Sequence, residues 1–182
     1  VLTTGTLTAP TLELVAASGG VTQTAGVLAA KNVVSGTGGI TGPVSLDNAA
    51  NTIAAIGNLT ATGAIEITSA AALDVAGTVK ATGIALTGSA AGSALSLAGG
   101  GALSLLASGT IALATTNATG STTLAGTIDA KATGTLQLAG AGTVTQTAST
   151  ITAGTITAPS TIGGADLGQK ANVIATLGTF NT

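Results

Sequence analysis

The chain has 182 residues, of which 38 are Ala, 36 are Thr and 28 are Gly, whereas only 5% are charged and a single residue, Phe180, is aromatic. Many apolar residues with little charge are the reverse of what disordered chains show, and the scarcity of aromatic side chains excludes an ordinary globular core. Four Lys and no Arg stand against six Asp and Glu, so the chain offers no basic surface for nucleic acid.

Nine short triplets of the form apolar, polar, apolar predict strands with one face buried. They lie at residues 12–14, 44–46, 65–67, 73–75, 84–86, 95–97, 103–105, 111–113 and 136–138. Clusters of Gly, Ser, Thr, Ala and Asn separate them and predict turns, and the dense Gly and β-branched Thr argue against helices despite the Ala content. Residues 99–101, three consecutive Gly, are interpreted as a turn because no Lys-Ser or Lys-Thr follows to make a phosphate loop.

The spacing of the triplets predicts an all-β solenoid. Ile65, Ile84 and Leu103 each open a triplet at intervals of 19 residues, as expected for the same side of successive coils. We predict a single parallel β-helix over residues 1–182 with about 20 residues per coil and about nine coils. The longer interval between Leu105 and Leu136 is assigned to extra residues in a loop at 114–123.

The sequence also contains a repeat that is longer than one coil. Residues 21–25 return verbatim at 144–148, and residues 51–57 return in similar form at 172–178, so 21–57 resembles 144–178 at an offset of 121–123. The two offsets differ by an even number, which keeps the same side chains facing inward. Because residues 5–10 also match 154–159, we interpret the chain as a segment of a longer array or as a unit that stacks on copies of itself.

Residues 144–154, followed by residues 172–180, resemble the repeat regions of bacterial filamentous-haemagglutinin-like adhesins, which are large secreted proteins of two-partner secretion. The resemblance extends in style over essentially the whole chain and matches the repetitive shaft of that family. It implies a right-handed parallel β-helix in a fibre that is extracellular or attached to the bacterial cell surface.

The absence of His and Cys removes the usual general base, disulfides and nearly all zinc or iron ligand sets. We therefore predict that the protein is not an enzyme and has no catalytic, cofactor or metal site. Glu66 and Asp74 are the acids weighed for carboxylate catalysis, but each is the middle residue of its triplet, and they are expected on different faces as surface charges. Lys80 and Lys131, in matching phrases, are interpreted as solubilising charges that discourage edge pairing rather than as ligand contacts.

Four further features are weighed against functional roles. Asn58 and Asn117 lie in glycosylation sequons that chance explains in so Thr-rich a chain. Pairs of the form Thr-x-Thr suggest an ice-binding ladder, but they cluster at the two ends of the chain. Asn51 and Asn172 are interpreted as turn residues, left-handed or stacked on their equivalents in the next coil. Phe180 is expected in the core or capping an end.

The sequence therefore predicts a structural, non-catalytic element of an extracellular bacterial surface fibre, either an adhesin shaft or an end-to-end polymerising subunit. Its expected partners are copies of itself or adjoining segments of a longer chain, because open coil ends expose strand edges. Apolar runs are too short for a membrane span. The alternatives are a surface adhesin that binds glycan or host protein through a lateral face and, less favoured, an ice-binding solenoid or a polysaccharide-active enzyme.

Overall fold

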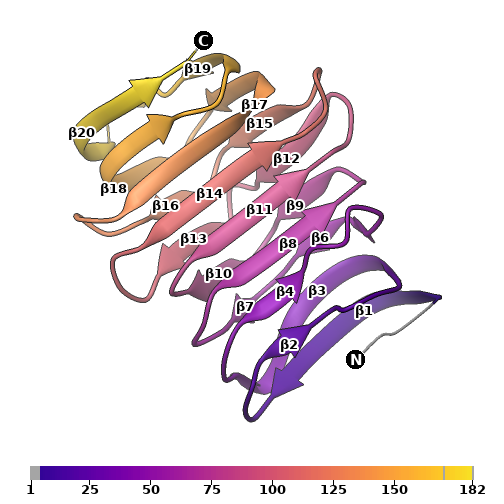
Figure 1. Ribbon diagram of the computed structural model, residues 1–182. Helices are drawn as coiled ribbons and strands as arrows, with labels where there is room; N and C mark the ends of the chain where they lie inside the picture. The colour runs from indigo at the N-terminus through magenta and orange to yellow at the C-terminus, as the bar shows by residue number, and fades with distance from the viewer. Residues whose placement is uncertain (1–4, 170, 182) are drawn as a thin grey trace.

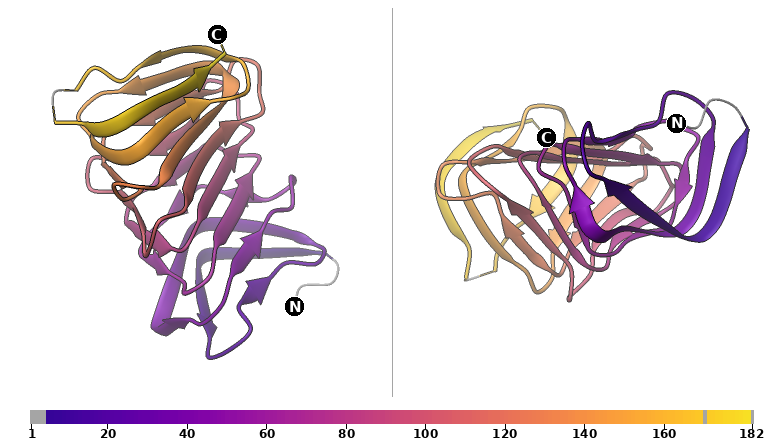
Figure 2. Two further views of the ribbon diagram at one scale, coloured as in Figure 1. Left: turned by 60° about the vertical axis from the view of Figure 1, so that its left-hand side comes forward. Right: turned by 90° about the horizontal axis from the view of Figure 1, so that it is seen from below.

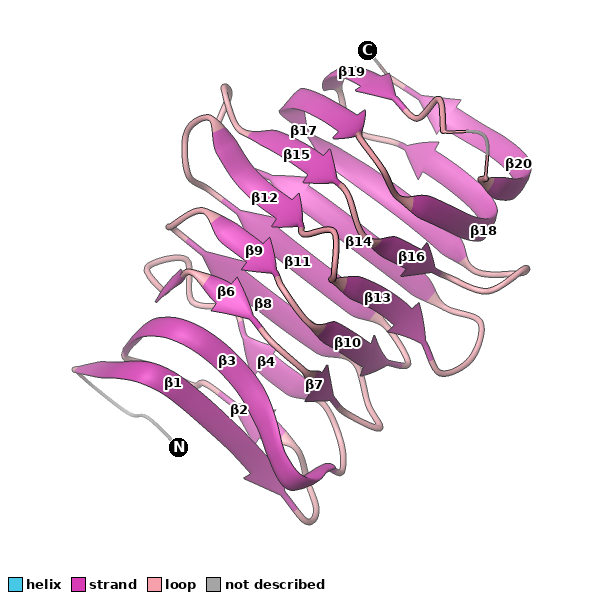
Figure 3. Cartoon of the chain, turned by 180° about the vertical axis from the view of Figure 1, so that it is seen from behind, coloured by secondary structure: helices cyan, strands magenta, loops and turns pink. Residues whose placement is uncertain are grey.

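A computed structural model describes residues 5–169 and 171–181, which form a parallel β-solenoid of about eight turns, roughly 22 residues apart. The described residues contain twenty strands and no helix (Figure 1). As the chain rises from its first coil to its last, the front strands in Figure 1 run to the right and those behind, seen in Figure 3, run back, so the winding is right-handed. The predicted all-β, right-handed parallel β-helix is confirmed.

The strands stack into three faces that run the length of the solenoid (Figures 1 and 3). Face 1 consists of the first halves of β1 (Thr6–Ala16) and β3 (Val27–Ile40), β5 (Thr52–Ile53), β6 (Ala55–Ile56), β9 (Leu73–Val75), β12 (Ser93–Leu97), β15 (Ser121–Leu124), the second half of β17 (Thr135–Gln146) and β19 (Ile162–Asp166). Face 2 consists of the second halves of β1 and β3, β7 (Leu59–Thr60), β10 (Thr78–Ala81), β13 (Ala102–Leu105), β16 (Thr127–Asp129) and the first halves of β18 (Thr150–Ala158) and β20 (Val173–Phe180).

Face 3 completes each coil. It consists of β2 (Val21–Thr22), β4 (Val44–Leu46), β8 (Ile65–Ser69), β11 (Ile84–Gly88), β14 (Thr110–Thr115), the first half of β17 and the second halves of β18 and β20. Every strand pairing within the three faces is parallel, so each coil bonds the coil before it along one edge and the coil after it along the other. None of the described segments is a helix of the length and apolarity needed to cross a membrane.

Alternation along each strand sends one set of side chains into the lumen. All nine predicted triplets lie in strands, and their first and third residues belong to the core, as in β8, where Ile65 and Ile67 are buried and Glu66 is exposed. A lumen enclosed by three short faces is narrow, which explains why Val, Ile, Leu and Ala suffice to fill it without aromatic residues.

The core side chains stack in columns, one member per coil. The clearest column runs through face 3, where in-register pairing places eight branched aliphatic residues above one another. They are Val21, Val44, Ile65, Ile84, Ile111, Leu136, Ile156 and Leu177. The six interior members are buried, and each contacts its like above and below. Coil-on-coil packing of this kind is the main source of stability in a solenoid.

The coil length predicted from the sequence needs a correction. Ile65 does pair with Ile84, 19 residues later, but Ile84 pairs with Ile111 and not with Leu103. Leu103 lies on face 2, where it pairs with Val79. The fifth coil is longer because its turns at 89–92, 98–101 and 106–109 each hold more residues than the corresponding turns at 70–72, 76–77 and 82–83.

The same turns explain why the chain makes about eight coils of roughly 22 residues rather than nine of about 20. The loop expected at 114–123 is also shorter than predicted, since β14 extends to Thr115 and β15 begins at Ser121. The extra residues are therefore spread over several corners of the fifth coil instead of forming one loop.

Glycines line the corner between faces 1 and 2, where successive backbones approach closely. A Cβ on Gly101 would lie 2.1 Å from the carbonyl oxygen of Val75, and one on Gly126 would lie 2.2 Å from the carbonyl oxygen of Gly101. Gly100, in contrast, has open space where its Cβ would stand. This corner therefore requires glycine at position 101 and at the equivalent position 126 of the next coil, whereas position 100 tolerates a side chain.

We expect Gly101→Ala to destabilise the protein by about 1–3 kcal/mol, because the added methyl group forces two coils apart. Gly100→Ala is the matched control and should change stability by no more than about 0.5–1 kcal/mol, if anything upward. Urea unfolding followed by circular dichroism measures both. Equal midpoints for the two variants would contradict the close approach at this corner.

Candidate functional site: internal amide pairs and open ends

A pair of side-chain amides lies inside the solenoid near its first coil. Gln23 Nε2 donates to Asn51 Oδ1 at 2.9 Å, and Asn51 Nδ2 donates back to Gln23 Oε1 at 2.8 Å. The same side chains also form hydrogen bonds with the backbone. Gln23 Nε2 donates to the carbonyl of Gly26, Asn51 Nδ2 donates to the carbonyl of Leu46, and the N–H of Leu28 donates to Asn51 Oδ1. Asn51 is fully buried, so this satisfied network joins successive coils from within.

A second pair near the last coil repeats every one of these bonds. Gln146 and Asn172 exchange hydrogen bonds of 2.7 and 2.8 Å. Gln146 Nε2 also donates to the carbonyl of Ser149, Asn172 Nδ2 donates to the carbonyl of Leu167, and the N–H of Ile151 donates to Asn172 Oδ1. We call the two networks the amide clasps, Gln23–Asn51 and Gln146–Asn172.

Each clasp interrupts the apolar lumen. In the register of β2 with β4, Gln23 occupies the position that Leu46 holds in the next coil, and Gln146 pairs with the buried Leu124 of the coil before. A buried amide costs free energy unless its hydrogen bonds are made, and these are made only when the two coils stand in the correct register. The clasps therefore specify which residues stack.

The two clasps lie at different corners of the solenoid. Gln23 follows β2 on face 3 and Asn51 precedes β5 on face 1, whereas Gln146 ends β17 on face 1 and Asn172 precedes β20 on face 2. The long repeat is therefore not a whole number of coils. It advances the same motif by five coils and one further face.

Asn51 and Asn172 each close a turn, as predicted, because their N–H groups donate to the carbonyls of Asn48 and Gln169. The predicted left-handed backbone and stacking are wrong: neither residue has a positive φ, and each pairs with Gln of the preceding coil rather than with an equivalent Asn. The sequence does contain a signal for this pairing. The segment that contains Gln23 and the segment that contains Asn51 both recur, in the same order and at nearly the same separation, around Gln146 and Asn172. That joint recurrence identifies two segments that contact each other.

Figure 2 shows the two ends of the solenoid, one at the first coil and one at the last. Side chains that belong to the core columns are exposed at both ends. At the C-terminal end Leu177 is 71% exposed, although its partner Ile156 in the coil before is buried. Phe180, on the same strand, packs partly buried against the core, as expected of a core or end residue. At the N-terminal end Leu7 is 41% exposed, although its register partner Leu28 in the second coil is buried. Both ends thus present a cross-section of the lumen.

A small apolar hollow opens at the N-terminal end. Its volume is about 130 Å³ and its lining includes Leu7, Leu12, Leu14, Val21, Leu28 and Leu46. Leu7, Leu12 and Leu14 of this lining lie on β1 and Val21 lies on β2, and the outer edges of these two strands have no pairing partner in the described chain. Unpaired edges beside exposed apolar side chains are the features through which strands recruit further strands.

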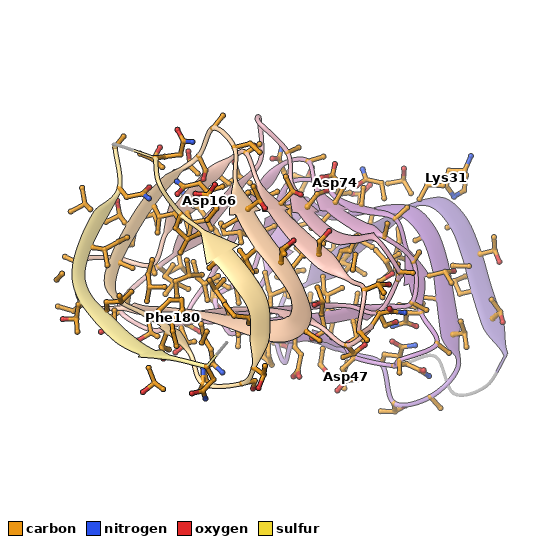
Figure 4. The ribbon with its side chains drawn as sticks, turned by 90° about the horizontal axis from the view of Figure 1, so that it is seen from above. Lys31, Asp47, Asp74, Asp166 and Phe180 are labelled. Carbon is orange, nitrogen blue, oxygen red and sulfur yellow. The ribbon has the colours of Figure 1, made fainter. Side chains whose placement is uncertain are left out.

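The two acids weighed for catalysis, Glu66 and Asp74, lie on the outer surface and on different faces. Glu66 is on β8 of face 3 and Asp74 on β9 of face 1, the separation that the sequence predicts. Figure 4 shows Lys31, Asp47, Asp74 and Asp166 around the perimeter of the solenoid. No group of three side chains suited to a metal ion gathers among residues 5–169 and 171–181.

Lys80 and Lys131 are not equivalent, despite their matching phrases. Lys80 points outward from β10, and its register partners on later coils are Ser104 and then Asp129. Residues 125–134 repeat residues 76–83 with Asp129 and Ala130 inserted before Lys131. β16 ends at Asp129, and Lys131 lies in a turn with a φ of 67°. There its Nζ contacts Asp129 Oδ2 at 2.5 Å, and this hydrogen bond holds the pKa of the Asp129 carboxyl below its usual value.

The Thr-x-Thr pairs are spread over all three faces. Thr6 and Thr8 lie on face 1, Thr150 and Thr152 on face 2, and Thr155 and Thr157 on face 3. A flat ladder of stacked pairs is therefore not formed by them. Of the sequon residues, Asn117 forms a turn with Thr119, and Asn58 Oδ1 accepts the N–H of Thr78.

A shallow groove of about 610 Å³ crosses several coils on the outside of the corner between faces 1 and 2. It is lined by Asn32, Val34, Ala55, Gly57, Asn58, Ala76, Gly77, Thr78 and Gly100. The Oδ1 atom of Asn32 is buried there without a hydrogen-bond partner among the described residues. The groove carries amide and backbone polar groups and no charged side chain.

Comparisons with protein-family models, curated proteins and solved structures give no match for this chain.

We expect Asn51→Leu to destabilise the protein by about 1–3 kcal/mol for each buried group it leaves unpaired. The double variant Gln23→Leu/Asn51→Leu should recover part of that loss, because Leu matches the column at position 23. Asn172→Leu should cost less than Asn51→Leu, since Asn172 is only partly buried. Urea unfolding midpoints of the unaltered protein, Gln23→Leu, Asn51→Leu and the double variant make up a double-mutant cycle, and Asn172→Leu is measured beside them. Strict additivity of the Gln23 and Asn51 changes would contradict the clasp.

Proposed function

We propose that this protein is a non-catalytic structural element of an extracellular bacterial fibre, acting as a shaft or as a subunit that polymerises end to end. The observation that carries the proposal is the face-3 column, which runs unbroken from one open end of the solenoid to the other. The column contains an aliphatic residue in every coil, and the last, Leu177, is mostly exposed. An apolar cross-section at each end favours continuation of the solenoid by another one.

The strand edges support the same proposal. In the described chain β20 has no neighbour beyond it, and neither β1 nor β2 has one before it, so each end offers a row of backbone donors and acceptors. Pairing by strand addition satisfies such groups and buries the side chains beside them. The partner that fits both ends is another parallel solenoid of the same cross-section, either a second copy or an adjoining segment.

The resemblance of residues 144–154 and 172–180 to filamentous-haemagglutinin-like repeats agrees with a role in a surface fibre. A right-handed parallel β-helix is the fold that this resemblance implies. The recurrence of a complete clasp one face further round the solenoid also suits a long array, because the same register device serves at more than one corner.

We expect the concentrated protein to form unbranched filaments in electron microscopy, with the strand spacing of about 4.8 Å along the filament axis. Leu177→Lys should abolish the filaments, because it places a charge in the end cross-section. Leu106→Lys is the matched control: Leu106 is 49% exposed in a lateral turn, and its replacement should leave filaments intact. Isolated rods from the unaltered protein would refute self-assembly.

The lateral groove supports a second candidate, a surface adhesin that binds a neutral glycan. Its amide groups and the unpartnered Asn32 Oδ1 suit sugar hydroxyls, which donate hydrogen bonds without carrying charge. If this candidate is correct, a glycan array yields a ligand, Asn32→Ala lowers its binding and Asn117→Ala, outside the groove, does not. An array without hits would leave the structural role alone.

A further inference from the structure

The face-3 column contains information about how two copies would meet. It begins at Val21, which is half-buried beside the N-terminal hollow, and ends at Leu177, which is 71% exposed. Both residues occupy the inward position that is buried in the six coils between them. No further coil lies beside either of them among residues 5–169 and 171–181, and a residue of the same kind in a neighbouring coil would bury each of them.

The two ends are the two halves of one interface. Inside the protein, the trailing edge of each coil bonds the leading edge of the next, with strands parallel and in register. β20 presents a trailing edge, whereas β1 and β2 present leading edges. Contact between two like ends would bring edges of the same kind together with their strands antiparallel, an arrangement found nowhere in the solenoid. A heterologous contact of unlike ends repeats the internal one and generates an open filament.

Resting on the proposed function, we infer that a second copy of this chain docks head to tail and face on face, so that Val21 of one copy packs on Leu177 of the copy before it. The recess beside Val21 receives the exposed apolar side chain of β20, and β2 pairs with the second half of β20. In this register each of the three faces continues without a step, and the face-3 column passes from one copy to the next.

Cysteine crosslinking tests this register cleanly, because the chain has no cysteine of its own. In-register residues on neighbouring parallel strands lie about 4.8 Å apart, within the range of Cα separations of about 4.4–6.8 Å that disulfides bridge. Val21→Cys protein mixed with Leu177→Cys protein should give a disulfide-linked dimer on mild oxidation. Either variant oxidised alone should stay monomeric on a denaturing gel.

Two controls keep the test decisive. Thr22→Cys mixed with Leu177→Cys is one residue out of register, with the two side chains on opposite sides of the sheet, and should lose the crosslink. Thr22→Cys mixed with Gly178→Cys restores the register on the outer side and should crosslink, which covers the case in which Val21→Cys folds poorly.

Dimers from either single variant, or filaments in which neither in-register pair crosslinks, would overturn the head-to-tail register. Such a result would leave the fibre role standing. Absence of filaments from the unaltered protein, in contrast, would overturn self-assembly and this register with it, and would leave only the shaft role of the proposed function.

Discussion

Each coil must place its inward side chains directly over those of the coil before, because the lumen between three short faces has room for little else. Branched aliphatic residues meet this condition in the face-3 column, where in-register pairs such as Ile84 and Ile111 repeat the same contact. The surface composition follows from the same geometry, since outward positions contact no core and accept Thr, Ser, Gly or a charge. A chain with one aromatic residue is therefore able to fold around an extended core.

A uniform column also creates a problem, because coils of similar side chains stack almost equally well in neighbouring registers. Slippage by two residues preserves the inward and outward pattern and costs little apolar contact. The amide clasps remove that degeneracy. Gln23 and Asn51 satisfy each other and three backbone groups only in one register, so a slipped coil leaves buried amides unpaired. Their recurrence as Gln146 and Asn172 places the same device near both ends.

Period-two alternation predicted the strands, the all-β class and the outward position of Glu66, because that pattern depends only on neighbours in the chain. It did not predict that Leu103 pairs with Val79, since turn lengths decide which triplets stack and several turns of the fifth coil are lengthened together. It did not predict the different surroundings of Lys80 and Lys131 either, because an inserted pair preserves facing only while the strand continues, and β16 ends at Asp129. The pairing of Asn51 with Gln23 was not predicted because the two residues lie 28 positions apart in the chain.

The rotation of the long repeat links the interior to assembly. A repeat of a whole number of coils would place every clasp at one corner and stiffen that corner alone. Because the motif advances by one face, from the corner of faces 3 and 1 to the corner of faces 1 and 2, register is fixed on different sides of the solenoid at its two ends. The lumen between them remains free of amide clasps, so the apolar column reaches both cross-sections intact. An interior organised in this way favours continuation at its ends over closure.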